Sequence, residues 1–147
     1  MIYKSLEECV LDLERHKMLV RIGEEVDPNL EMAEIHRRVY QAGGPAILYE
    51  RVKGSPFRAV SNLFGTIERA RFIFRHTLER VQKLVRLKAD PSQALKSPLN
   101  FFDTPLTALN ALPWKVPGGA VLEHRAKISD LPQIKCWPED AGPFVLM

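Results

Sequence analysis

Residues 43–60 read GGPAILYERVKGSPFRAV, and this stretch decides the fold. Gly43-Gly44-Pro45 ends a preceding helix, because glycine adopts the left-handed cap and proline cannot continue the helix. Two short apolar runs follow, residues 46–49 and 57–60, with turn-forming residues between them. Apolar runs of this length on either side of a turn that contains glycine and proline predict a β-hairpin.

Two helices and a strand are expected before the hairpin. Ser5 and Glu8 have the spacing of a capping box, worth about 1 kcal/mol, for a helix that ends near His16 and Lys17. Residues 18–22 then read as a strand that ends at Gly23. Asp27-Pro28 supplies a capping side chain and a first-turn proline for the second helix. The buried positions expected on that helix are Met32, Ala33, Ile35, Val39 and Tyr40.

Two further helices and a proline-rich arm are expected after the hairpin. Thr66 caps a third helix, and a fourth covers residues 78–88 with Leu78, Val81, Leu84, Val85 and Leu87 facing inward. Prolines at positions 91, 98, 105, 113 and 117 exclude a long helix, so residues 90–127 are predicted to form an extended covering arm. Within it a short helix is expected around Leu95 and a strand over residues 120–124. The predicted class is α+β: a small mixed or antiparallel sheet with flanking helices, followed by this arm.

Composition restricts the class of protein further. With 147 residues, 46% hydrophobic and 27% charged, the chain reads as one ordinary globular domain. No apolar run approaches the roughly 20 residues that a transmembrane helix needs, and the acidic, amphipathic N-terminus is not a secretory signal. Two cysteines, Cys9 and Cys136, offer no disulfide framework and fit a reducing compartment. The cytoplasm is the expected location.

Positive charge is concentrated in residues 66–88. The net charge is +3, but this segment alone holds seven cations against Glu68 and Glu79, a local +5, which leaves −2 for the rest. The cations are Arg69, Arg71, Arg75, Arg80, Lys83, Arg86 and Lys88. An alternative function follows, a stand-alone interaction module that binds RNA or an acidic partner. The segment contains no tyrosine or tryptophan for base stacking, so a solvated or subunit-facing surface is favoured over a nucleic-acid site.

The residues that could carry chemistry do not form a recognisable site. His16, His36, His76 and His124 lack the spacing of a zinc helix. Cys136 follows Lys135, which could lower its thiol pKa, but no histidine partner is identifiable. Gly65-Thr66 could hold an anion at a helix start, which is weak support, and Glu139 and Asp140 are adjacent and point to opposite sides of an extended chain. Neither catalytic nor metal-binding residues are therefore predicted.

Three stretches resemble the UbiD family of decarboxylases. The first is EIHRRVYQAGGPAILYE at residues 34–50, and the second combines VKGSPF at 52–57 with SNLFGTIER at 61–69. The third is LP at 131–132 followed by CWPEDAGPF at 136–144. The resemblance covers essentially the whole chain in the family's order, except that residues 130–135 are a slightly altered version of the family's approach to CWPED.

The resemblance implies a longer enzyme and a cofactor. Family members carry out reversible, non-oxidative decarboxylation of aromatic or α,β-unsaturated acids with prenylated FMN, a divalent metal, typically manganese, and potassium. Their metal ligands and catalytic residues lie in a central split β-barrel, beyond the position matching Met147. The resemblance therefore implies an α+β N-terminal domain over residues 1–89, the arm over 90–127 and the start of a truncated flavin domain over 128–147.

The expected properties of the chain follow from that division. Residues 144–147, FVLM, are an apolar run that fits the first strand leading into the barrel, and Met147 falls about where the family places a residue near the flavin. The chain alone is expected to be inactive and to bind no flavin or metal. Its expected partners are the remaining domains and, at full length, further copies of itself, with no nucleic acid. A natural small subunit that pairs with a separately encoded barrel is a third possibility.

Overall fold

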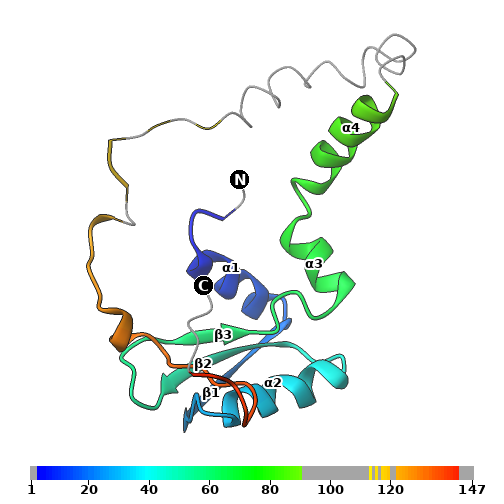
Figure 1. The fold of residues 1–147 in the computed structure, drawn as a ribbon. Helices are drawn as coiled ribbons and strands as arrows, with labels where there is room; N and C mark the ends of the chain where they lie inside the picture. The colour runs from blue at the N-terminus through cyan, green and yellow to red at the C-terminus, as the bar shows by residue number, and fades with distance from the viewer. Residues whose placement is uncertain (1–2, 91–112, 114, 116, 120–121, 143–147) are drawn as a thin grey trace. The chain divides into compact units, whose positions relative to one another are not determined.

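The apolar run after Pro45 forms the middle strand of the sheet. In a computed structural model, which describes residues 3–90, 113, 115, 117–119 and 122–142, β2 (Ala46–Val52) lies between β1 (Leu19–Val26) and β3 (Ala59–Ser61) (Figure 1). β3 pairs antiparallel with β2, which confirms the predicted hairpin. β1 pairs parallel with β2. The sheet is therefore mixed, and the predicted α+β class with flanking helices is confirmed.

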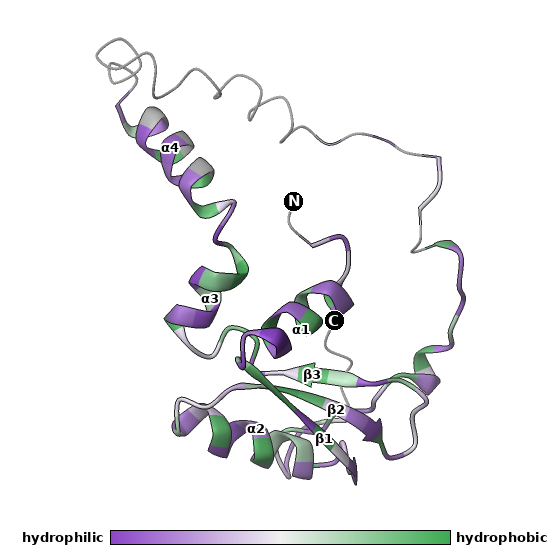
Figure 2. Cartoon of the chain, turned by 180° about the vertical axis from the view of Figure 1, so that it is seen from behind, coloured by the Kyte–Doolittle hydropathy of each residue, from purple (hydrophilic) through white to green (hydrophobic). Residues whose placement is uncertain are grey.

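Each face of β2 has its own hydrophobic cluster, because side chains alternate between the faces of a strand. Ala46 and Leu48 pack on one face with residues of α1 (Leu6–Arg15) and α3 (Ile67–Ile73): Cys9, Val10, Leu13 and Ile73. Ile47 and Tyr49 pack on the other face with Met32 of α2 (Glu31–Gln41). Figure 1 shows α1 and α2 on opposite sides of the sheet. In Figure 2, β2 is accordingly hydrophobic along its first half and hydrophilic toward its end.

The first and third helices begin as the sequence predicts. Ser5 Oγ accepts a hydrogen bond from the Glu8 backbone N at 3.2 Å, and the Glu8 carboxylate accepts from the Lys4 backbone N at 2.7 Å. Thr66 Oγ1 accepts from the Arg69 backbone N at 3.2 Å. Side-chain oxygens therefore satisfy N–H groups that each helix start leaves without an intrahelical partner.

The prediction that Gly23 ends the first strand is wrong. β1 continues to Val26, and its pairing with β2 shifts register between Ile22 and Glu25. Such a bulge adds a residue to one strand without ending the pairing. Gly23 lies within the bulge, and its carbonyl oxygen accepts a hydrogen bond from Arg51 Nε at 2.7 Å.

The second helix differs from its prediction at the start and on one face. α2 begins at Glu31, not at Pro28, because the backbone of the expected first turn is bonded elsewhere in the chain. Tyr40, expected to be buried, is 55% exposed, and its ring stacks on His36 with centroids 6.2 Å apart. Met32 is buried as expected, and Ile35 and Val39 pack against the same cluster.

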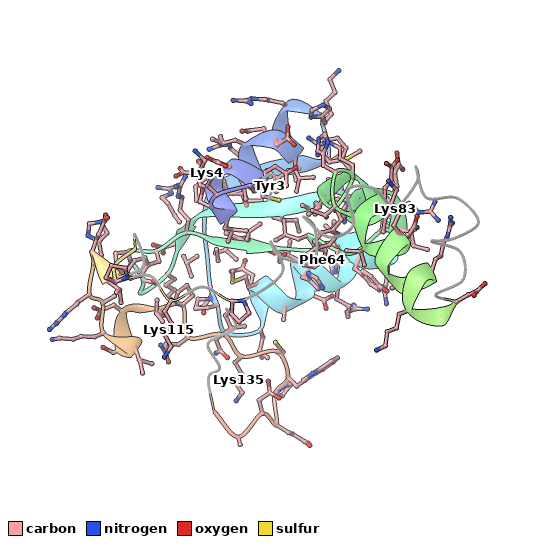
Figure 3. The ribbon with its side chains drawn as sticks, turned by 90° about the horizontal axis from the view of Figure 1, so that it is seen from above. Tyr3, Lys4, Phe64, Lys83, Lys115 and Lys135 are labelled. Carbon is pink, nitrogen blue, oxygen red and sulfur yellow. The ribbon has the colours of Figure 1, made fainter. Side chains whose placement is uncertain are left out.

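Residues 128–140, here named the C-terminal strap, lie against Ser55, residues 28–30 and the cluster around Tyr49. The strap begins with a short 3-10 helix, η3 (Ile128–Asp130). Ser55 Oγ donates to the Asp130 carbonyl at 2.6 Å, and Ile134 packs against the cluster around Tyr49. Lys135, labelled in Figure 3, forms an isolated parallel bridge with Asn29. Segments about a hundred residues apart in the sequence are thereby joined.

The chain divides into two compact units: residues 3–73 with 124–147, here named the sheet unit, and residues 1–2 with 74–123. The second unit contains α4 (Leu78–Ala89), in which Val81 and Val85 are 53% and 62% exposed, so the expectation that they face inward is wrong. A strand is expected over residues 120–124, but the described residues 122–124 do not form one. The short helix expected around Leu95, most of the proline-rich arm and the run at 144–147 lie outside the described residues. Among the residues that are described, none forms a helix long and apolar enough to span a bilayer.

Candidate functional site

The most constrained polar group in the sheet unit is the guanidinium of Arg69. The residue is only 4% exposed although it carries a charge. Its Nε donates to the carbonyl oxygens of Asn62 and Leu63 at 3.1 and 3.0 Å. One terminal nitrogen donates to Asn62 O at 2.6 Å and the other to Gly44 O at 3.1 Å. All three nitrogens of the side chain are thus bonded to backbone oxygens, as a buried guanidinium requires.

Asn62 completes the same group of hydrogen bonds. Its side-chain nitrogen donates to Gly44 O at 3.2 Å and to Pro45 O at 2.8 Å. Its backbone has φ 58°, a left-handed conformation that asparagine tolerates better than most residues. We name Gly44, Pro45, Asn62, Leu63 and Arg69 the Arg69 cluster. It joins the GGP stretch before β2 to the SNLFGTIER stretch after β3.

Two glycines are required by close contacts beside this cluster. A Cβ atom at Gly65 would lie 1.8 Å from Asn62 Oδ1, and one at Gly44 would lie 2.8 Å from Val39 Cγ1. Contacts under 3.0 Å force the surroundings to shift. Both positions therefore exclude a side chain while the cluster keeps its geometry.

Two helix ends meet near Arg69 and explain how its charge is tolerated. Gly43 N and Gly44 N donate to the carbonyls of Tyr40 and Val39 at 2.9 and 2.8 Å, the pattern of a Schellman motif, which confirms the predicted helix stop. The end of α1 shows the same pattern, with Lys17 at φ 58°. The C-terminus of a helix carries partial negative charge, which favours a nearby cation. Burial nevertheless lowers the pKa of Arg69 from its usual value.

An open cavity of about 390 Å³ lies against this region. Its lining residues are His16, Lys17, Met18, Gly43, Gly44, Pro45, Thr66, Glu68 and Arg69. The volume is within the range of small-molecule sites. However, the nitrogens of Arg69 are already bonded to carbonyls, and His16 Nδ1 lies 2.9 Å from the Asp12 carbonyl. The Arg69 guanidinium and His16 Nδ1 are therefore used within the fold and do not converge on a ligand.

The four histidines are not brought together. His16 lies at the end of α1 against Phe72, with ring centroids 4.6 Å apart, and His76 and His124 are exposed. His36, expected on the solvated side of its helix, is half-buried, and its Nδ1 is buried without a hydrogen-bond partner. Within the described ranges, no three histidine, cysteine or acidic side chains are close enough to hold a metal ion.

Residues 136–140, the CWPED part of the third stretch, form a turn around a carboxylate. Asp140 Oδ2 accepts from the backbone nitrogens of Cys136 and Trp137 at 2.8 and 2.9 Å, and Asp140 N donates to Trp137 O at 3.1 Å. Glu139 is exposed and Cys136 is a free, half-buried thiol. The carboxylate of Asp140 therefore closes the turn; the segment is a turn and not the extended chain from which Glu139 and Asp140 were expected to point to opposite sides.

The positive segment spans two units of the chain, and one of its cations is buried. Arg69 is buried, and the segment divides between α3 in the sheet unit and α4 in the other unit. Arg71 and Arg86 are exposed. Counting Arg69 among the surface cations was therefore wrong, which weakens the case for a phosphate-binding face.

Sequence reasoning missed the Arg69 cluster, although a signal for it was present. The two stretches that carry the family resemblance each contribute half of the cluster, and charge counting hid Arg69 among its neighbours. The GGP stretch and the SNLFGTIER stretch lie on either side of the hairpin, and the second contains Arg69. This arrangement could have indicated that the two stretches contact each other.

A comparison with protein families indicates the same family that the three sequence stretches resemble. The sequence model of the N-terminal domain of 3-octaprenyl-4-hydroxybenzoate carboxy-lyase matches residues 10–88. An uncharacterized protein of Chlamydia trachomatis is 35% identical over 97% of this chain, and one of Synechocystis is 36% identical over 98%. The chain covers 25% and 31% of the length of these two relatives.

Two solved structures are similar to part of this chain. The vanillic acid decarboxylase of Sedimentibacter hydroxybenzoicus in open form is 31% identical, with a TM-score of 0.46 over 49% of this chain and 16% of that chain. An evolved dimeric form of the UbiD-class enzyme HmfF from Pelotomaculum thermopropionicum, in complex with prFMN, is 30% identical, with a TM-score of 0.49 over 60% of this chain and 20% of that chain. The family model alone covers more than half of the chain, so this protein belongs to the UbiD N-terminal domain family.

Proposed function

We propose that this chain is the N-terminal domain of a UbiD-like decarboxylase and that it has a structural role in that enzyme. The observation that carries the proposal is the Arg69 cluster. Its residues come from the stretches that resemble the family, and they are used to hold the sheet unit together. The residues of this domain that resemble the family would then specify its fold, and the groups that react with substrate would lie elsewhere in the enzyme.

The activity proposed for the whole enzyme is reversible, non-oxidative decarboxylation of an aromatic or α,β-unsaturated carboxylic acid. Prenylated FMN, held together with manganese and potassium, would be the reactive cofactor. The described residues do not fit the manganese ion, since no set of three or more possible metal ligands lies together among them. We therefore assign no step of the reaction to residues of this chain.

The proposed partners are the remaining domains of the same enzyme and, at full length, further copies of it. The proposed division is residues 1–89 as the N-terminal domain, 90–127 as a covering arm and 128–147 as the start of the flavin domain. Met147 is proposed to lie at the edge of the flavin site. The C-terminal strap belongs to the same compact unit as residues 3–73 and contacts it through Ser55 and Asn29, so it would hold the flavin domain close to the sheet.

The proposal is tested by comparing the chain alone with the chain joined to a UbiD-class catalytic region. The purified chain is incubated with prenylated FMN and Mn²⁺, passed through gel filtration, and assayed for flavin absorbance and for CO2 release from aromatic and α,β-unsaturated acids. We expect neither from the chain alone, and both when the catalytic region is present in the same polypeptide. Turnover by the chain alone would contradict the proposal, as would an inactive joined protein that binds the flavin and is fully folded.

A further inference from the structure

Leu30, directly before α2, has a strained backbone. Its φ is 71° and its ψ is −38°, in a region that a bulky side chain rarely adopts. The Glu31 backbone N donates to Asn29 O at 2.9 Å across it. This geometry is close to the rarer of the two γ-turn forms, which is strained for residues other than glycine. Strain of this kind persists only where surrounding contacts maintain it.

Those contacts come from the C-terminal strap. Leu30 N donates to Lys135 O at 2.9 Å, and Lys135 N donates to Pro28 O at 3.1 Å. Two further contacts fix the strap before Lys135: the hydrogen bond from Ser55 Oγ to Asp130 O and the packing of Ile134 against the cluster around Tyr49. Residue 135 therefore binds the strained turn through its main chain.

The unstrained alternative is already present in the local sequence. Asp27 Oδ1 accepts from Asn29 N at 2.8 Å, as a capping side chain does in the first turn of a helix. Asp27 N donates to Glu31 Oε2 at 2.7 Å, and Pro28 follows at the position that proline favours. The main-chain hydrogen bonds differ from those of a helix that begins at Pro28. Glu31 N is bonded to Asn29 O, and Asp27 O accepts from Met32 N at 3.1 Å. In a helix that began at Pro28, Asp27 O would accept from Glu31 N.

We propose that the C-terminal strap is a latch that keeps the first turn of α2 unwound. When Lys135 leaves Pro28 and Leu30, Glu31 N transfers from Asn29 O to Asp27 O, and α2 lengthens toward its N-terminus by one turn. The helix then starts where the sequence alone predicts. Because Met32 lies one residue after Glu31 and packs in the cluster around Tyr49, movement of the strap is transmitted to the core of the sheet unit. The latch depends on contacts within this chain and not on the proposed function.

The first test removes the hydrogen bond that the strap donates. Lys135→Pro lacks the N–H that reaches Pro28 O, and Lys135→Ala is the matched control, because it removes the same side chain and keeps that N–H. NMR Cα chemical shifts of residues 28–31 are measured in the full 147-residue chain. We expect helical shifts in Lys135→Pro and wild-type shifts in Lys135→Ala. Non-helical shifts at residues 28–31 in both variants would overturn the proposal.

The second test relieves the strain without touching the strap. Leu30→Gly permits the positive φ, whereas Leu30→Ala removes nearly the same side chain and keeps the strain. Hydrogen exchange at the Lys135 amide reports opening of the latch. We expect this exchange to be about tenfold slower in Leu30→Gly than in Leu30→Ala, because the closed latch no longer carries the strain. Equal or faster exchange in Leu30→Gly would overturn the proposal, because it would show that strain at Leu30 does not favour release of Lys135.

Discussion

The Arg69 cluster and the C-terminal strap both join segments that are distant in the sequence, but they do so through different atoms. In the Arg69 cluster, the guanidinium and the Asn62 amide reach the carbonyls of Gly44, Pro45 and Leu63. In the strap, the backbone of Lys135 pairs with the backbone of Pro28 and Leu30. Side-chain contacts restrict which residues can occupy a position, whereas backbone contacts restrict mainly the path of the chain. Substitutions should therefore have their largest effect in the Arg69 cluster.

Arg69→Met should be the most destabilising change. It removes the guanidinium donor from three carbonyl oxygens: Leu63 O loses its donor, whereas Gly44 O keeps the Asn62 amide and Asn62 O keeps the Gly65 N–H. One unsatisfied buried group costs about 1–3 kcal/mol. We expect a loss of about 3 kcal/mol in the free energy of unfolding, measured by urea titration. Arg71→Met, on the exposed side of the same helix, is the control and should change it by less than about 0.5 kcal/mol. Equal effects from the two variants would place Arg69 at the surface.

Gly65→Ala should have the next largest effect. The added methyl group would meet Asn62 Oδ1 at 1.8 Å and push apart the turn that presents two carbonyls to Arg69. Overpacking of this kind costs about 1–3 kcal/mol. Thermal and urea unfolding should both detect it. Gly142→Ala, where no atom lies within 4 Å of the new Cβ, is the matched control and should be neutral. A neutral Gly65→Ala would mean that the turn can relax without cost.

Asp140→Ala should have a smaller effect within the strap. The carboxylate accepts two backbone hydrogen bonds, from Cys136 and Trp137, in a half-exposed turn. Loss of such a cap costs about 1 kcal/mol. Hydrogen exchange at the Trp137 amide should become faster, and Glu139→Ala should leave it unchanged, because the Glu139 side chain is exposed. Unchanged exchange in Asp140→Ala would show that the turn forms without the carboxylate.

The smallest predicted effect is a pH dependence on the surface of α2. Hydrogen bonds from Arg37 and Arg38 lower the pKa of Glu34 from 4.5 to about 2. A carboxyl group with a lowered pKa stabilises the fold above its unfolded value of 4.5, and this contribution is lost as the pH falls toward 2. Glu34→Gln should therefore be slightly less stable than wild type near neutral pH, and the difference should vanish once the pH falls well below the folded pKa of about 2. A difference that persists at low pH would assign the effect to packing.

Local signals in the sequence predicted much of the sheet unit. The Ser5 and Thr66 caps, the Gly43-Gly44 helix stop and the hairpin each depend on residues within a few positions of one another. Turn and capping chemistry acts over that distance, so sequence alone could indicate it.

The errors have a different physical origin. The first turn of α2 was predicted from Asp27-Pro28, but bonds to residue 135 replace it. β1 passes through Gly23 because its pairing with β2 absorbs an extra residue. Arg69 is buried because carbonyls from two distant segments surround it. In each case tertiary contacts decide between conformations that the local sequence leaves close in free energy.

The most direct test of the Arg69 cluster is NMR observation of the Arg69 Nε–H group. This group donates to two carbonyl oxygens in a residue that is 4% exposed. We predict a resolved Arg69 Nε–H signal whose exchange with water is at least about tenfold slower than that of Arg71 in the same sample. Exchange at equal rates would contradict the account, because it would place the Arg69 guanidinium in solvent.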